Sequence, residues 1–218
     1  MNNATSLISL IVFAPSLFLL YFILGKYDKY FKHNKAFFMI AIGLGFGLMA
    51  GIFSFYLPLG EFFWTLVLVF FIELSKLLIL LQKPFRLNHD STFYGMSFGI
   101  GIAAMFTFVN TYSSGLSLTS AAFIFLIAYN YTLINSSTGA IIGFGSYKGE
   151  FWRYLMRGFI LHGGLGFFLS LVWNGQFSQN GSFALLIIGA IYSTVIFLYT
   201  YNEILEKTVP DKLKKLDV

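Results

Sequence analysis

The sequence Tyr94-Gly95-Met96-Ser97-Phe98-Gly99-Ile100-Gly101-Ile102-Ala103-Ala104-Met105-Phe106-Thr107-Phe108-Val109-Asn110 places three small residues, Gly95, Gly99 and Ala103, four positions apart within an apolar run. Residues four apart lie on the same face of a helix, so these three form one narrow stripe. Such a stripe lets a second helix backbone approach closely, and in lipid this packing supplies much of the association between helices. We therefore predict a membrane-spanning helix that packs along this small-residue stripe.

The composition around the stripe is that of an integral membrane protein. Of 218 residues, 57% are hydrophobic and only 11% are charged, and the mean hydropathy is +0.77. Residues 91–147 contain no Asp, Glu, Lys, Arg or His, and in residues 158–202 His162 is the only ionisable residue besides tyrosines. A helical span needs about 20 predominantly apolar residues. The sequence therefore predicts an all-α, multi-pass membrane protein.

Polar turns divide the long apolar stretches into seven predicted spans, at residues 4–24, 36–57, 62–82, 91–111, 118–146, 151–174 and 182–202. The fifth is too long for one straight crossing, so we expect it to tilt or to break at the polar residues 130–137. The seven spans form a single domain, residues 1–202. Residues 203–218 are expected to form a short cytoplasmic tail with an interfacial or solvated helix.

The basic residues predict the orientation of the chain. Thirteen of the fourteen Lys and Arg residues fall in segments 26–35, 83–86 and 148–157 and after residue 206, and the loops between these segments contain none. By the positive-inside rule the N-terminus is outside and the C-terminus cytoplasmic. This distribution also explains the basic isoelectric point, so we expect no nucleic-acid ligand. The location is an endomembrane or plasma membrane in a eukaryote, and the cytoplasmic membrane in a prokaryote.

The N-terminal segment is expected to remain as a membrane span. It lacks a basic region before its apolar run, and that run is longer than in an ordinary signal peptide. Asn3 and Asn180 begin Asn-x-Ser/Thr triplets on the predicted outer side, where glycosylation is possible in a eukaryotic secretory pathway. The chain has no cysteine, which excludes disulfides and thiolate ligands.

Ionisable residues inside the predicted spans are the candidate functional groups. Glu73 and Lys76 share a face of the third span, and burying a charge near the bilayer centre costs about 3 kcal/mol or more. One interpretation is an ion pair within the helix, with Lys76 snorkelling toward the cytoplasmic surface. The other notes that Glu73 and His162 lie at the same depth in their spans. They could then form a hydrogen bond across the bundle or line a polar cavity that handles water.

The predicted spans lack most of the residues that hydrolysis or metal binding requires. Activation of water by carboxylates needs a second acidic group, and a metal site needs three or four ligands. Glu73 is the only acidic residue in the predicted spans, and the other histidines, His33 and His89, lie in predicted inner loops. We therefore predict no metal and no cofactor. The glycines between Gly43 and Gly47 lie mid-span, where helix packing explains them better than phosphate binding.

The motif around the stripe resembles a known family. Residues 95–100 read Gly-Met-Ser-Phe-Gly-Ile, followed by Phe106 and Asn110, and this pattern is similar to the fourth span of the anterior-pharynx-defective (Aph) subunit of gamma-secretase. Other segments resemble the same family in the same order, namely Phe13-Ala14-Pro15-Ser16, the pair Glu73 and Lys76, and His162-Gly163-Gly164-Leu165 followed by Trp173-Asn174. The seven-span arrangement with an outer N-terminus is also that of the Aph family.

Two positions depart from the Aph pattern. Ala103 stands where the family has its third stripe glycine, and it is still small. Asn135 or a neighbour stands where the family has a histidine in the fifth span. Asn135 can donate and accept hydrogen bonds, but it cannot titrate. The resemblance thus implies a polar interior of Glu73, Lys76, Asn135 and His162 that fixes packing or lines a cavity.

A second resemblance is to the PrsW-type intramembrane proteases of the same superfamily, through Tyr94-Gly95, Gly99, Gly101 and His162. Those proteases carry two adjacent glutamates in one motif span and another glutamate in the next. Here the adjacent pair is Ile72-Glu73, and Phe106 stands at the position of the other glutamate. The absence of these two carboxylates favours the Aph-like interpretation over the enzyme.

The Aph resemblance implies a non-catalytic scaffold that assembles an intramembrane aspartyl protease complex. Its partners would be a presenilin-like protease and a nicastrin-like protein, and Gly95, Gly99 and Ala103 would make the close helix contact, with a partner or within the chain. The alternative is a divergent PrsW-like protease with Glu73 and His162 as catalytic residues. A transporter or receptor has only the span count in its favour, since the two halves show no corresponding broken segments.

Overall fold

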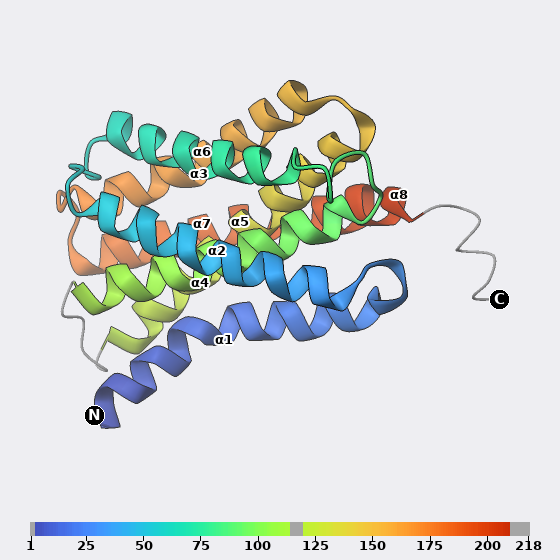
Figure 1. The fold of residues 1–218 in the computed structure, drawn as a ribbon. Coiled ribbons are helices and arrows are strands. Elements are labelled where there is room, and N and C mark those ends of the chain that lie inside the picture. The colour runs from blue at the N-terminus through green and yellow to red at the C-terminus, as the bar shows by residue number, and fades with distance from the viewer. Residues whose placement is uncertain (1–2, 114–119, 210–218) are drawn as a thin grey trace.

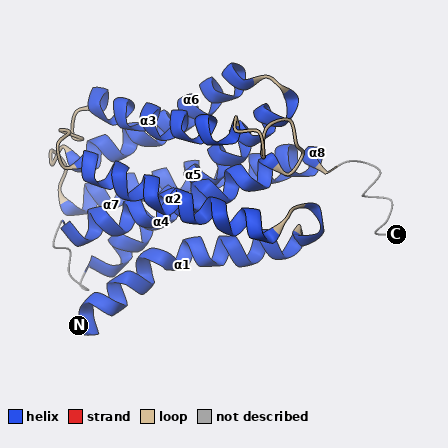
Figure 2. Cartoon of the chain, viewed as in Figure 1, coloured by secondary structure: helices blue, strands red, loops and turns tan. Residues whose placement is uncertain are grey.

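The computed structural model describes residues 3–113 and 120–209, and every regular element in these ranges is helical (Figure 2). The predicted all-α fold is therefore confirmed. The long helices are α1 (Asn3–Lys26), α2 (His33–Ser54), α3 (Phe62–Leu80), α4 (Ser91–Ser113), α5 (Ala121–Lys148), α6 (Phe151–Trp173) and α7 (Gln179–Tyr199). Three short elements complete the described chain: η1 (Asp28–Tyr30), the π-helix η3 (Thr200–Leu205) and α8 (Glu206–Thr208).

Five helical segments in the described ranges are long and apolar enough to cross a membrane, namely His33–Ser54, Phe62–Leu80, Ser91–Ser113, Phe151–Trp173 and Gln179–Thr208. The first predicted span contributes only a shorter apolar stretch, Leu7–Phe22, and α5 is not among the five. Large apolar side chains cover the outside of the bundle: Leu10 and Phe18 are each 69% exposed and Ile160 is 65% exposed. An apolar outer surface of this kind is compatible with a helical membrane protein.

Successive long helices run in alternating directions, so the connecting loops gather at two ends of the bundle (Figure 1). At one end the Asn174 side-chain amide donates to the Gly60 carbonyl at 3.1 Å. At the other end Lys35 Nζ donates to the Pro84 carbonyl at 3.1 Å, and the guanidinium of Arg86 lies 5.2 Å from the ring centre of Phe151. This second end carries the loops 27–32, 81–90 and 149–150, and we call it the basic end.

The small-residue stripe faces α5 of the same chain. A Cβ atom placed on Gly95 would collide with the backbone carbonyl of Gly139, and one on Gly99 would collide with that of Asn135. Gly139 is opposed in turn by Gly95, so the two backbones touch with no side chain between them. Ala103, the third member of the stripe, is fully buried. The close contact predicted from the sequence is thus made within the chain, and this face is not open to a partner.

The opposite side of α4 packs equally closely on α2. A Cβ atom on Gly101 would collide with the Ile40 carbonyl, and Cβ atoms on Gly43 and Gly47 would collide with the carbonyls of Phe98 and Ile102. The sequence-based assignment to helix packing is therefore confirmed for Gly43 and Gly47, but it is wrong for Gly45, which has nothing within 4 Å of an added Cβ atom. Because glycines let the α4 backbone approach α5 on one side and α2 on the other, α2, α4 and α5 form a tight three-helix layer.

Helix α5 is continuous from Ala121 to Lys148, so the break considered at residues 130–137 does not occur. The polar residues there are buried, and Asn130 and Thr132 bind neighbouring helices without interrupting α5. Asn130 donates to the Leu186 carbonyl of α7 at 3.1 Å, and Thr132 shares a hydrogen bond with Ser16 of α1 at 3.0 Å. Since its backbone hydrogen bonds are intact, these side chains act as links between helices rather than as a helix stop.

Beyond residue 202 the helix continues through η3 and α8. Leu205 and Thr208 are 0% and 1% exposed, and the Thr208 hydroxyl donates to Thr92 Oγ1 at 3.0 Å. The first part of the predicted tail is therefore packed on one side against the basic end of α4, while Glu203 and Lys207 on its other side are exposed. The rest of that predicted tail, residues 210–218, lies outside the described residues.

The glycine contacts lead to a matched pair of substitutions. Gly99→Ala should lower the free energy of unfolding by about 1–3 kcal/mol, because its methyl group has no room against the Asn135 carbonyl. Gly45→Ala adds the same methyl group to α2, where nothing lies within 4 Å, and should be neutral or stabilising. Thermal unfolding of the two purified proteins in detergent measures the difference. Equal stability of both variants would contradict the packing described for α4 and α5.

Candidate functional site

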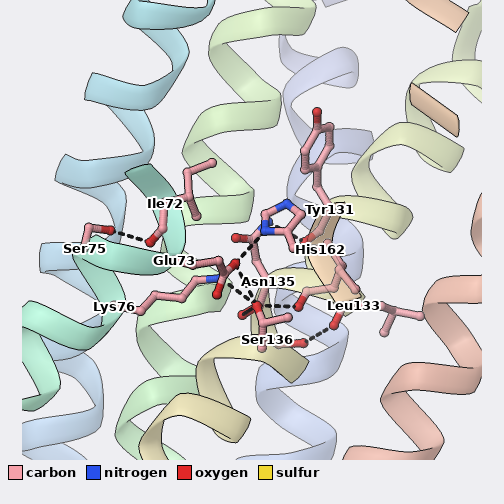
Figure 3. Close-up of polar contacts among 11 residues, drawn as sticks. Ile72, Glu73, Ser75, Lys76, Tyr131, Leu133, Asn135, Ser136 and His162 are labelled. Atoms are coloured by element: carbon pink, nitrogen blue, oxygen red, sulfur yellow. Dashed lines mark hydrogen bonds and ion pairs between the residues drawn. The ribbon is translucent and has the colours of Figure 1, made fainter. Parts of the chain in front are cut away.

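Glu73 lies in the middle of α3 and is completely buried. Its Oε1 atom lies 2.6 Å from Lys76 Nζ, on the next turn of the same helix, and 2.5 Å from Nδ1 of His162 on α6. Figure 3 shows the Lys76 ammonium group and the His162 ring converging on this carboxylate. Lys76 and His162 are themselves 0% and 2% exposed. The structure shows both the ion pair within α3 and the contact with His162 across the bundle. The snorkelling expected for Lys76 does not occur, because its ammonium group is buried between Glu73 and Thr138.

A third helix reaches the carboxylate through Thr138 of α5, a residue that no motif of the sequence singles out. Lys76 Nζ donates to Thr138 Oγ1 at 2.7 Å. The hydroxyl lies 3.0 Å from Glu73 Oε1 and 3.0 Å from the Ile134 carbonyl, and it can donate its single proton to either oxygen. We call Glu73, Lys76, Thr138 and His162 the polar cluster. It joins α3, α5 and α6 at one point in the interior.

Thr138 was missed because a lone threonine in an apolar helix usually bonds to its own backbone. The available signal was position. Gly139 of α5 packs against Gly95 of α4. Thr138, the residue before it, therefore points to a neighbouring side of α5, where α3 and α6 pack. That inference needs the helix order in space, which the spacing of residues in sequence does not supply.

Asn135 is buried beside the polar cluster but forms no hydrogen bond with Glu73, Lys76 or His162 (Figure 3). Its side-chain amide donates to the Tyr131 carbonyl one turn earlier at 3.1 Å, and its Oδ1 has no hydrogen-bond partner. The predicted four-residue interior is therefore formed by Glu73, Lys76 and His162, with Thr138 in the place expected for Asn135.

The electrostatics of the polar cluster follow from the hydrogen-bonding capacity of each group. An ionised carboxylate can only accept, so His162 donates its Nδ1 proton and Lys76 donates an ammonium proton to Glu73. The ammonium and the carboxylate neutralise each other, and a neutral imidazole tautomer completes the contact. The buried charges of this cluster are thus balanced by groups of the chain itself.

One oxygen of the carboxylate stands apart. Glu73 Oε2 has no hydrogen-bond partner, and it faces the backbone of α6 at Gly158, where an added Cβ atom would lie 3.2 Å from it. Gly158 therefore provides the space in which this oxygen sits. An unpartnered buried carboxylate oxygen is unusual and is a point at which a water molecule or a substrate group could bind.

Phe106, which the sequence motif aligns with a glutamate of the PrsW-type proteases, lies between α4 and α5. Its ring is 1% exposed and packs edge-on against Tyr131 of α5, with ring centres 4.8 Å apart. An aromatic pair of this kind fills the volume between α4 and α5 and leaves no carboxylate near Glu73 from α4. Among the described residues, no three His, Asp or Glu side chains come together as a set of metal ligands.

Among the cavities lined by described residues, two open on the outside of the bundle without contact with Glu73 or His162. One, of about 460 Å³, lies between α1, α5 and α7, and the other, of about 260 Å³, lies between α5, α6 and the end of α7. The polar cluster itself is closed to the surface, as the exposures of its members show. Its geometry suits a link between helices, and any catalytic use requires an opening of α3 from α6.

Single and double substitutions test how the buried charges are balanced. Lys76→Met leaves the Glu73 carboxylate buried without its cation, and should lower the free energy of unfolding by about 3–5 kcal/mol. The double variant Glu73→Gln with Lys76→Met removes both charges and should be more stable than Lys76→Met alone. Thermal unfolding in detergent checks this, with Lys83→Met in the exposed loop as a control. If the double variant loses as much free energy of unfolding as Lys76→Met and Glu73→Gln lose together when made singly, the pairing is contradicted.

The comparisons with known proteins give no relatives. No protein family model matches the chain, and neither a curated protein nor a solved structure matches it. The resemblances to the Aph family and to the PrsW-type proteases therefore rest on the motifs of the sequence.

Proposed function

We propose that this chain is a non-catalytic membrane scaffold of the Aph type, which spans the bilayer seven times and assembles an intramembrane aspartyl protease complex. The observation that carries the proposal is the closed polar cluster. Glu73 is held by Lys76, Thr138 and His162 of the same chain, at 2.5 to 3.0 Å, and all four side chains are buried. Side chains that bond to each other across three helices in this way hold those helices in fixed positions.

The surroundings of the cluster support the same proposal. Hydrolysis by carboxylates needs a second acidic group that can exchange a proton with water. Phe106 and Tyr131 fill the region between α4 and α5 where the protease relatives carry that group. A presenilin-like protease and a nicastrin-like protein are the proposed partners. Because α5 covers Gly95, Gly99 and Ala103, these partners would contact outer helix faces rather than the small-residue stripe.

A second candidate function is a divergent PrsW-like protease, and one specific observation favours it. A carboxylate with one unpartnered oxygen is in contact with an imidazole at 2.5 Å. Such a pair can hold and deprotonate a water molecule once water reaches it. In this function Glu73 would be the general base and His162 would orient it, after a movement of α6 away from α3.

The proposed orientation places the basic end in the cytoplasm and the N-terminus outside. The natural chain has no cysteine, so single cysteines can report it directly. Gln176→Cys, in the exposed loop before α7, should react with a membrane-impermeant maleimide on intact cells. Lys83→Cys, in the loop at the basic end, should react only after the cells are permeabilised. The reverse pattern would overturn the orientation, and labelling of both on intact cells would overturn the span count.

Affinity purification from the native membrane, followed by identification of the proteins that co-purify, tests the scaffold function. We expect an intramembrane aspartyl protease in stoichiometric amount. Purified chain alone should not cleave a transmembrane peptide. Cleavage that Glu73→Gln abolishes would replace the scaffold proposal with the PrsW-like enzyme. A chain that purifies without a protease and shows no cleavage would contradict both candidate functions.

A further inference from the structure

The smaller of these two cavities combines an apolar wall with one basic side chain. It is a crevice of about 260 Å³ between α5, α6 and the π-helical end of α7, and its lining is apolar apart from one cation and a tyrosine. The residues that line it are Ile141, Arg157, Ile160, Leu161, Tyr199 and Ile204. Tyr199 directly precedes η3 and Ile204 lies within it, and π-helical turns recur at functional sites.

Arg157 is the basic residue in the lining of this crevice, and no acidic side chain of the described residues balances its charge. Its guanidinium lies 5.1 Å from the ring centre of Tyr154, and within residues 3–113 and 120–209 it forms no ion pair. On the neighbouring helices, Arg153 pairs with Glu150 at 2.8 Å and Lys207 pairs with Glu203. Lys148 of α5 lies over the rings of Phe144 and Tyr147 and does not line the crevice. An anion that enters the crevice therefore meets one available guanidinium.

The crevice lies at the depth where a phospholipid changes from headgroup to acyl chain. Arg157 is six residues from the start of α6 at the basic end, which corresponds to about 9 Å along the helix axis. Trp152 and Tyr199, near the same end, are 70% and 45% exposed. Exposed Trp and Tyr side chains are typical of the interface between lipid and water.

We infer that this crevice binds an anionic glycerophospholipid from the leaflet at the basic end. The planar guanidinium of Arg157 pairs with the phosphate through two N–H groups, and an acyl chain lies against Ile141, Ile160 and Leu161. A soluble phosphate ester would contact Arg157 but not the apolar side chains of the crevice. A lipid contacts both, through its phosphate and its acyl chain. The inference depends on the chain lying in a membrane, and it does not depend on the scaffold or protease function.

Native mass spectrometry of the full chain in detergent measures retention of added phosphatidylglycerol and phosphatidylcholine. We expect the wild-type protein to retain phosphatidylglycerol in preference, and Arg157→Gln to weaken that retention at least about tenfold. Arg153→Gln removes the same charge one turn away on α6 and should leave retention unchanged. Ile160→Trp fills the crevice without a change of charge and should weaken retention as well.

Three outcomes would overturn the lipid site. The first is equal retention of the two lipids by the wild-type protein. The second is equal weakening by Arg157→Gln and Arg153→Gln, which indicates attraction to surface charge in general. The third is displacement of phosphatidylglycerol by glycerol 3-phosphate at the same concentration, which indicates an anion site without a role for the acyl chain. Arg157 and Ile160 are exposed, so their variants are expected to fold. An elution volume in size exclusion equal to that of the wild-type protein checks this for each variant.

Discussion

The close approach of three backbones at α4 is the contact on which the rest of this structure depends. Gly95 and Gly99 let α4 touch α5, and Gly101 with Gly43 and Gly47 lets α2 touch its other side. In a membrane, burial of apolar groups gives little drive for helix association, so contact at backbone distance has to supply much of it. The three-helix layer then provides a fixed surface, and α1, α3, α6 and α7 are positioned against it.

The polar residues of α5 determine where those outer helices lie. A hydroxyl or amide inside the bundle loses free energy unless it finds a partner, so each one favours a particular neighbour. Thr132 is bonded to α1, Asn130 to α7, and Thr138 to the Glu73–Lys76 pair of α3, which reaches His162 of α6. The same residues that lower the hydropathy of α5 therefore make it the central element of the bundle.

The sequence predicted where the helices lie along the chain, but it did not predict which helices contact one another. Apolar length predicted the helices, and the pattern of basic loops predicted which loops share an end of the bundle. The polar run at residues 130–137 was misjudged as a possible break, because a sequence does not show that α1 and α7 carry the partners of these residues. Thr138 was missed and Asn135 overrated for the same reason, since one turn of α5 decides which side chain faces Glu73.

By itself the sequence determined that this chain is helical, apolar and rich in close-packing glycines, and that its interior ionisable residues include Glu73, Lys76 and His162. These properties follow from composition and from the helical repeat, which are local. Only the tertiary structure decided that the small-residue stripe is covered by α5, that Glu73 contacts His162, and that Arg157 lines an apolar crevice. Those facts depend on the rotation and order of whole helices, which are set by the sum of many contacts between residues far apart in sequence.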